Sequence, residues 1–76
     1  MSITVRYFAS VRETLGRSED HFESAAPLSV AEVWRRAAAV PLPPRLLAAI
    51  NQQHAGLDAM VKEGDEVAFF PPVTGG

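Results

Sequence analysis

The chain has 76 residues and no cysteine, and its 7 basic and 9 acidic residues give a net charge of −2. This length fits one small domain, and the lack of cysteine excludes disulfides, thiolate nucleophiles and cysteine-ligated zinc. No block of lysines and arginines alternates with aromatic residues, so nucleic acid is not expected as a direct partner. We find neither a signal-peptide pattern nor an apolar run of membrane-spanning length, and we expect a soluble, cytoplasmic protein without membrane attachment.

The first third of the sequence predicts a strand, a short helix and a second strand. Along residues 3–8 the side chains would point alternately to the two faces of a sheet, and this period of two is typical of a half-buried strand. Ser10 and Glu13 have the spacing of a capping box, in which Ser10 would accept a hydrogen bond from the Glu13 N–H, and Gly16 is placed to end the helix. Residues 18–24 are polar and weakly patterned, and we predict an edge strand there.

The main helix is predicted to begin at Ser29. Ser29 and Glu32 form a second capping box, and Pro41 closes the element. One helix face is apolar, because the following residues recur at helical spacing: Val30, Val33, Trp34, Ala37 and Ala38. We expect Trp34 to be the main core residue of this helix, in preference to a ligand-stacking role.

The second half of the sequence predicts three more strands. Residues 46–50 form a short apolar run; its leucine and alanine content favours a helix, whereas its length and its flanking turn residues favour a buried strand, which we predict. Turn residues at 51–52 and 56–58 flank another short strand. A charged turn at 62–66 precedes the last strand, at residues 67–70.

The predicted order is strand, helix, strand, helix and three strands. It indicates an α+β fold, a mixed sheet of about five strands with one main helix packed across it and a short helix after the first strand. We expect residues 1–70 to form this body, and residues 71–76 to form an extended C-terminal tail of the same single domain.

Phe8 and Phe70 are predicted to face away from the core. Neighbouring strand residues point to opposite sides of a sheet, so both phenylalanines point outward if Tyr7 and Phe69 point inward. Two exposed phenylalanines near the start of the tail would form an apolar patch, which small soluble monomers seldom carry without a partner. Covering by neighbouring loops is the alternative.

The body of the chain offers no convincing active site. His21 and His54 lack the spacing and the accompanying carboxylates of a metal site, so no metal is expected. Ser10 and Ser29 are interpreted as helix caps and not as nucleophiles. The acidic side chains of the 62–66 turn are expected to be solvated, with docking of a basic partner as the alternative.

The last six residues carry the strongest functional signal. Pro71 and Pro72 supply no N–H donors, so the last strand ends there and a stiff spacer begins. The four residues that follow reach roughly 13 Å, at about 3.3 Å per residue. Gly75 and Gly76 have no side chains, so a narrow foreign pocket can enclose them and reach the backbone carboxylate of Gly76. An inert chain end is the alternative.

Three segments carry a resemblance to a known family. They are FASVRE at residues 8–13, AINQ at 49–52 and GDEVAFFPPVTGG at 64–76. Over its whole length the chain resembles the sulfur-carrier subunits of molybdopterin synthase, which are ubiquitin-like β-grasp proteins, and its FFPPVTGG end is the most specific part. Residues 17–26 and 41–44 match this family poorly.

The resemblance implies that Gly76 carries sulfur. An E1-like adenylyltransferase would use ATP to adenylate Gly76, and a sulfur-donating enzyme would convert the adenylate to a thiocarboxylate. Within the large subunit of molybdopterin synthase, in a heterotetramer, the sulfur would pass to cyclic pyranopterin monophosphate while Thr74 and Gly75 thread the channel. The carrier would bind no cofactor and would not be catalytic alone. Its docking residues would be Phe8, Phe70 and, more weakly, His54.

Other functions remain open at this point. Sulfur carriers for thiamine or for transfer-RNA thiolation resemble this fold and also end in Gly-Gly, although the diproline argues against the thiamine branch. A ubiquitin-like modifier would instead join Gly76 to lysines of target proteins. A plain binding module with an inert tail is the remaining hypothesis.

Overall fold

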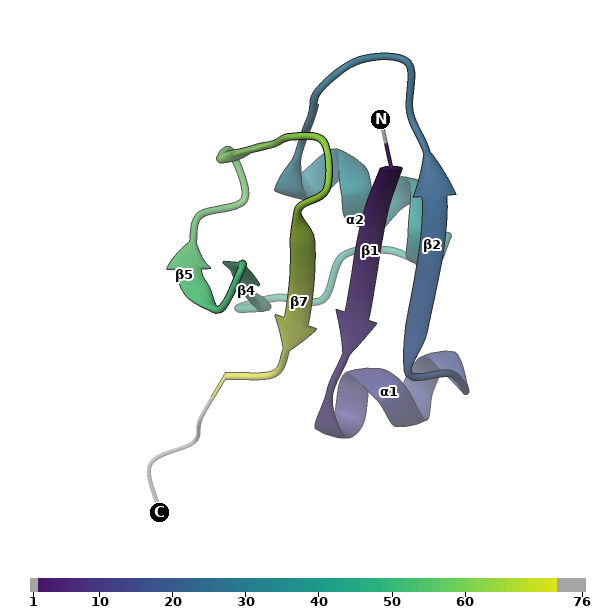
Figure 1. Ribbon diagram of the computed structural model, residues 1–76. Helices are drawn as coiled ribbons and strands as arrows, with labels where there is room; N and C mark the ends of the chain where they lie inside the picture. Colours follow the sequence, from purple (N-terminus) through teal and green to yellow (C-terminus); the bar gives the residue numbers. More distant parts are fainter. Residues whose placement is uncertain (1, 73–76) are drawn as a thin grey trace.

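The computed structural model describes residues 2–72, and its helices and strands follow one another as shown in Figure 1. In chain order they are β1 (Ser2–Tyr7), α1 (Ala9–Leu15), β2 (Glu19–Glu23), β3 (Leu28–Ser29), α2 (Val30–Ala38), β4 (Leu47–Ile50), β5 (Gln53–Ala55), β6 (Met60–Val61) and β7 (Glu66–Phe70).

Five of these strands form one mixed sheet, in the order β2-β1-β7-β4-β5. β1 and β7 run parallel, and the other neighbouring strands are antiparallel. α2 lies across one face of this sheet, behind it in Figure 1, whereas α1 lies at the end of β1. The predicted α+β architecture, a mixed sheet with one main helix across it and a short helix after the first strand, is confirmed.

β1 forms because its side chains alternate between a buried and an outer face. Ile3, Val5 and Tyr7 are fully buried beneath α2, and the residues between them face the other side. β2 pairs with β1 at the edge of the sheet, as predicted. Its charged residues suit an edge, because they discourage pairing with a further strand.

α1 begins in a different way from the prediction. Its N-cap is Phe8, which makes no side-chain capping hydrogen bond, and Ser10 is already the second helical residue. The predicted Ser10 cap is therefore wrong. The reason is that the Phe8 carbonyl oxygen already accepts from the Val11 N–H at 3.1 Å and the Arg12 N–H at 3.4 Å, while the Phe8 N–H donates to the Phe69 carbonyl oxygen at 3.1 Å and keeps Phe8 itself extended. The predicted stop is confirmed, since Gly16 adopts the left-handed conformation at φ 73° and donates its N–H to the Arg12 carbonyl oxygen.

α2 begins as predicted. The Ser29 hydroxyl accepts a hydrogen bond from the Glu32 N–H at 3.2 Å, which satisfies one of the free donors of the first turn. The helix ends at Ala38, and the left-handed conformation of Ala39 turns the chain away before Pro41. The apolar face predicted for this helix packs on the sheet, since these of its residues are buried: Val30, Val33, Trp34 and Ala38.

Trp34 of α2 is the centre of the core, as predicted. Its ring centroid lies 4.9 Å from the ring centroid of Phe69 and 6.2 Å from that of Tyr7, and both pairs are arranged edge to face. Such aromatic pairs contribute about 0.5–1.5 kcal/mol beyond the burial of their surface. This cluster fixes α2 over the middle of the sheet, where β1 and β7 lie side by side.

The ambiguous run at residues 46–50 is a strand, as predicted. β4 pairs with β7 on one side and with β5 on the other, so tertiary pairing overrides the helix preference of leucine and alanine. Asn51 and Gln52 join β4 to β5 with positive φ values of 51° and 71°, the conformation of a two-residue hairpin turn. The predicted turn is therefore confirmed.

A second, two-stranded sheet was not predicted. β3 and β6 pair over only two residues each, Leu28 with Val61 and Ser29 with Met60. Two residues are too few to show a hydrophobic period, so nothing in the local sequence indicates them. This small sheet holds the start of α2, because the Val30 N–H then donates to the Ala59 carbonyl oxygen at 2.9 Å.

None of the helices in residues 2–72 is long and apolar enough to cross a membrane. β7 ends at Phe70, and Pro71 and Pro72 follow it outside any strand. The division of the chain into a body at 1–70 and a tail at 71–76 stays a prediction.

Candidate functional site

The fold places the start of the tail where β1 and β7 end together, beside α1 (Figure 1). The hydrogen bond from the Phe8 N–H to the Phe69 carbonyl oxygen extends the parallel pairing to this point. We call Phe70, Pro71 and Pro72 the tail root. The three residues predicted to act in the tail, Thr74, Gly75 and Gly76, lie outside the described residues.

Phe70 and His54 meet on the outer face of the sheet, opposite α2. Their ring centroids are 5.5 Å apart and the rings are nearly perpendicular. Phe70 comes from β7 and His54 from β5, with β4 between them. Two predicted docking residues are thus side by side at the tail root. Phe70 is half-buried and His54 is exposed, so a partner can reach both rings.

Phe8 lies on the other side of the tail root. Its side chain is 43% exposed, and the Arg6 guanidinium lies 5.9 Å from the centre of its ring. Arg6 is itself held on the outer face by Glu66, with 3.2 Å between Arg6 Nη1 and Glu66 Oε2. No ring contact joins Phe8 to Phe70 within residues 2–72. The predicted outward orientation of both phenylalanines is confirmed, and their role in docking stays a prediction.

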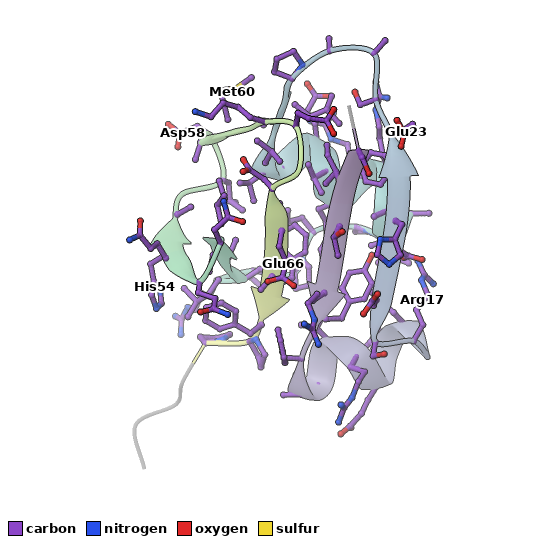
Figure 2. The ribbon with its side chains drawn as sticks, viewed as in Figure 1. Arg17, Glu23, His54, Asp58, Met60 and Glu66 are labelled. Carbon is purple, nitrogen blue, oxygen red and sulfur yellow. The ribbon has the colours of Figure 1, made fainter. Side chains whose placement is uncertain are left out.

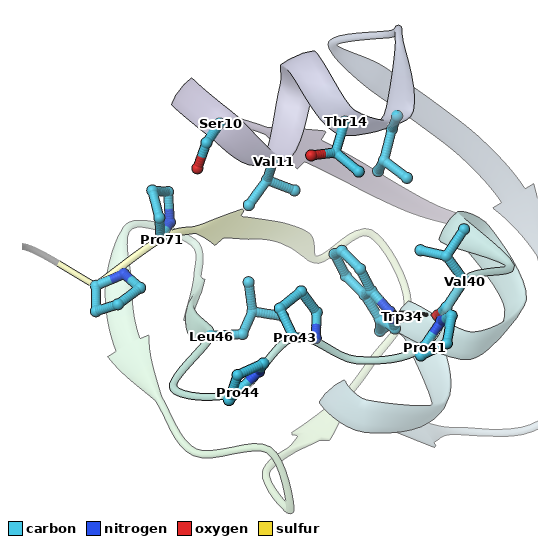
Figure 3. A pocket seen from close by; sticks show the side chains of 12 residues that line it. Ser10, Val11, Thr14, Trp34, Val40, Pro41, Pro43, Pro44, Leu46 and Pro71 are labelled. Carbon is cyan, nitrogen blue, oxygen red and sulfur yellow. Dashed lines mark hydrogen bonds between the residues drawn. The ribbon is translucent and has the colours of Figure 1, made fainter.

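A groove of about 330 Å³ opens beside α1 and reaches the tail root, because Pro71 and Pro72 are among its lining residues (Figure 3). Four parts of the chain contribute to its walls. They are α1 between residues 10 and 15, Trp34 of α2, the stretch between residues 40 and 46, and the pair Pro71 and Pro72. This groove was not predicted from the sequence, in which Pro41 was interpreted only as a helix stop and Ser10 only as a cap. The unused signal was the number of prolines at 41–44 and 71–72.

A polar network ties the end of β1 to the connection after α1. The Tyr7 hydroxyl donates to Asp20 Oδ2 at 2.9 Å, and Arg17 Nε donates to the same oxygen at 2.6 Å. Arg17 Nη2 also donates to the Ala37 carbonyl oxygen in the last turn of α2. Burial, and then the Asp20 carboxylate, raise the pKa of Tyr7, while the hydrogen bond to Asp20 raises the pKa of Arg17. This network is structural, since it joins β1, β2 and α2.

The acidic turn before β7 is also structural. The Asp65 carboxylate accepts hydrogen bonds from the Lys62 N–H at 2.8 Å and from Asn51 Nδ2 at 2.9 Å. These bonds lower the pKa of Asp65, the one from Lys62 most. Asn51 Oδ1 in turn accepts from the Glu66 N–H, so the turn is tied to the β4-β5 hairpin. The expectation that these side chains are simply solvated is therefore wrong for Asp65.

The remaining histidine is paired locally. His21 Nδ1 lies 3.2 Å from Thr4 Oγ1, and its Nε2 lies 2.6 Å from Glu19 Oε2, all on the open outer face of β1 and β2. Within residues 2–72 no three histidine, aspartate or glutamate side chains gather in a way that could hold a metal ion.

Comparison with known proteins gives a consistent result. The family profile described as the ThiS family matches residues 5–76. The chain is similar to the molybdopterin synthase sulfur carrier subunit of Escherichia coli, with 43% identity over 82 residues, and to that of Haemophilus influenzae, with 41% identity over 80 residues. Each alignment covers 97% of this chain and 99% of the relative.

Solved structures share the fold. SAMP1 from Haloferax volcanii matches with a TM-score of 0.78 and 24% identity over the whole of both chains. A chain of the complex of subunits 1 and 2 of the molybdopterin-converting factor from Helicobacter pylori matches with a TM-score of 0.58 and 20% identity, again over the whole of both chains. Urm1 from Trypanosoma brucei matches with a TM-score of 0.71 and 19% identity, covering 99% of this chain and 95% of that chain. These likenesses confirm the predicted ubiquitin-like β-grasp fold.

Proposed function

This chain belongs to the ThiS family, and we infer that it is the sulfur carrier of molybdopterin synthase in molybdenum cofactor biosynthesis. The observation that carries this conclusion is the identity of over 40% with two named sulfur carrier subunits along nearly the full length of all three chains. The arrangement of the described residues supports it, because β7 leads from a closed core directly to the tail root, which carries the half-buried Phe70 ring and lies close to the exposed Phe8.

We propose that the reactive group is the backbone carboxylate of Gly76. A carboxylate is a poor electrophile, so it must first be activated. An E1-like adenylyltransferase would join Gly76 to the AMP portion of ATP, with release of pyrophosphate. A sulfur-donating enzyme would then deliver sulfur to the acyl carbon, AMP would leave, and a thiocarboxylate would remain on Gly76. ATP would thus be consumed by the activating enzyme, and the carrier would bind no cofactor of its own.

We propose that the large subunit of molybdopterin synthase is the partner that receives the tail, in a heterotetramer. A structural relative from Helicobacter pylori belongs to a complex of subunits 1 and 2 of the molybdopterin-converting factor, which supports a partner of this kind. The tail would enter through Thr74 and Gly75, and two deliveries of sulfur would convert cyclic pyranopterin monophosphate to molybdopterin. The carrier would act as the sulfur-donating subunit and would not be catalytic alone.

The body of the carrier would present and dock the tail. The half-buried Phe70 ring, supported by His54, and the exposed Phe8 ring lie on either side of the point where the tail leaves. Aromatic rings of this kind are common energetic anchors in interfaces. We further propose that the protein works in the cytoplasm, and its lack of cysteine is compatible with a reducing compartment.

The direct test is coexpression with the E1-like enzyme and a sulfur source, followed by intact mass measurement. We expect one oxygen of Gly76 to be replaced by sulfur, and we expect no change in a matched variant that lacks Gly76. An unchanged mass of the wild-type chain, with partners shown to be active on another carrier, would contradict a sulfur-carrier function.

A second step separates the possible pathways. Addition of the large subunit and of cyclic pyranopterin monophosphate should yield molybdopterin from the thiocarboxylated chain. Conjugates between Gly76 and lysines of other proteins would instead identify a modifier, and transfer of sulfur only to thiamine precursors or to transfer RNA would identify another carrier of the same fold.

A further inference from the structure

The groove beside α1 differs from the outer-face aromatic pair in being concave and mainly apolar, with Ser10 and Thr14 among its lining residues. Val11 of α1 faces Leu46 across it (Figure 3), and five prolines are among its other lining residues: Pro41, Pro43, Pro44, Pro71 and Pro72. A concave apolar site of this volume can accept one bulky side chain with part of its backbone. Pro72, the last residue that the structure describes, belongs to its wall.

The groove is preformed. The indole Nε1–H of the buried Trp34 donates to the Val40 carbonyl oxygen at 2.9 Å, which fixes the segment after α2 against the core. Proline rings have few conformations to lose, and α1 is closed by the left-handed Gly16. A partner that enters this groove therefore orders little of the carrier, and the cost of binding is low.

Exposed apolar side chains gather at the same place. Val40 lines the groove and is 38% exposed, and Leu42 is exposed between two groove-lining prolines. The exposed Arg45 lies in the sequence between the groove-lining Pro44 and Leu46, and no ion pair holds its guanidinium within residues 2–72. An apolar slot beside an unpaired cation is complementary to an apolar side chain beside a carboxylate.

We propose that this groove docks a leucine-like or phenylalanine-like side chain, next to an acidic residue, on the protein that takes up the tail. The reason is continuity: a pocket that encloses residues 73–76 must adjoin Pro72, and Pro72 is a wall of the groove. This inference rests on the proposed function, under which the protein that takes up the tail is the large subunit of molybdopterin synthase. It would hold the tail root from two sides, with Phe70 and His54 on the outer face and the groove on the inner side.

The test fills the groove without disturbing the core. Thr14 is exposed on α1 and lines the groove, whereas its neighbour Glu13 is exposed on the same helix and does not line it. We expect Thr14→Trp to weaken binding of the large subunit at least about tenfold, which corresponds to about 1.4 kcal/mol, and Glu13→Trp to change it less than about twofold. Equal affinities of Thr14→Trp and wild type, measured by titration calorimetry, would overturn the proposal.

Two further variants test the remaining features and give an independent check should Thr14→Trp unfold. Val40→Asp places a charge in the groove and should weaken binding about tenfold, and Arg45→Glu should weaken it about threefold, the range of one interfacial residue. Met60→Asp is the control, because Met60 is 55% exposed at the end of the molecule away from the tail (Figure 2). Loss of affinity in Met60→Asp equal to that in Val40→Asp would overturn the proposal.

Failure of this inference is distinguishable from failure of the proposed function. If the wild-type chain neither binds the large subunit nor gains sulfur, the proposed function is wrong. If the wild-type chain binds and delivers sulfur while Thr14→Trp and Val40→Asp bind equally well, only the groove assignment is wrong.

Discussion

Phe69 and Phe70 are neighbours in β7, yet they belong to two different regions of the molecule. Phe69 is 0% exposed and packs against Trp34 and Tyr7 in the core beneath α2. Phe70 lies on the outer face, where its ring meets the exposed His54 at the tail root. One residue along a strand thus separates the centre of the core from the proposed docking surface.

A small carrier can in this way assign stability and recognition to different residues of one strand. A strand turns successive side chains to opposite faces, so β7 closes the core with one set of residues and presents the other set to a partner. The tail then leaves from the end of that same strand, so the core fixes its starting point. Changes on the two faces should therefore have separable effects on stability and on binding.

The largest effect on stability should come from Phe69. Phe69→Ala removes a fully buried ring from the aromatic cluster and should lower the free energy of unfolding by about 3–5 kcal/mol. The matched variant Phe70→Ala should lower it by about 1 kcal/mol or less, because the ring is half-buried and lies outside the core. Equilibrium denaturation in urea measures both. Similar losses in the two variants would show that the two faces of β7 are not separate.

The complementary experiment measures affinity for the large subunit. Phe70→Ala should weaken binding by about 10–100-fold, the loss expected of an aromatic anchor at an interface. Phe69→Leu is the control, since it keeps an apolar side chain in the core and leaves the outer face unchanged. His54→Ala should have a smaller effect than Phe70→Ala, because its ring mainly supports that of Phe70. Weaker binding by Phe69→Leu than by Phe70→Ala would reverse the assignment of the two faces.

Much of the fold could be predicted because its elements carry a clear local pattern. The alternation of residues 3–8 and the helical spacing around Trp34 each report burial on one face, and the structure confirms both. The pairing of Leu28 with Val61 could not be predicted, because two residues show no period and their partners are far apart in the sequence. The start of α1 was also missed: the helix begins earlier than the Ser10 cap predicted, directly after Phe8, whose position is fixed by a tertiary hydrogen bond to Phe69.

The candidate site shows the same limit. The outward orientation of Phe8 and Phe70 follows from strand alternation alone, and the sequence predicted it. The contact between Phe70 and His54 requires β4 to lie between β7 and β5, which is a property of the sheet order. The groove requires α1, α2, the 40–46 stretch and the pair Pro71 and Pro72 to meet, so a residue such as Thr14 carries no local sign of its position in it.

The next prediction concerns the network that ties β1 to α2. The pKa of Tyr7 is raised by folding, so its contribution to stability is fully present below the pKa of an unfolded tyrosine, about 10, and is lost as the pH rises through the native pKa. Unfolding and tyrosinate formation should therefore occur together in alkali. Tyrosinate absorbance reports this directly, because the chain has 1 tyrosine. Formation of tyrosinate near pH 10 in the folded protein would contradict the raised pKa.

The matched variant removes the hydroxyl. Tyr7→Phe should lower the free energy of unfolding at neutral pH by about 1.5 kcal/mol, since Asp20 loses one donor but keeps Arg17. Its stability should then depend less on pH above about 10 than that of wild type. A steeper alkaline loss in Tyr7→Phe would show that another group governs that pH range.

The smallest effect comes from the two serines that the sequence placed in identical capping roles. Ser29→Ala removes the hydroxyl that accepts from the Glu32 N–H and should lower the free energy of unfolding by about 1 kcal/mol. Ser10→Ala should change it by less than about 0.5 kcal/mol, because Ser10 is inside α1 and alanine favours a helix. Ser29→Asp is the control, since aspartate also caps and should retain most of the stability. A loss in Ser10→Ala equal to that in Ser29→Ala would show that the Ser10 hydroxyl stabilises α1 as a cap, contrary to the structure.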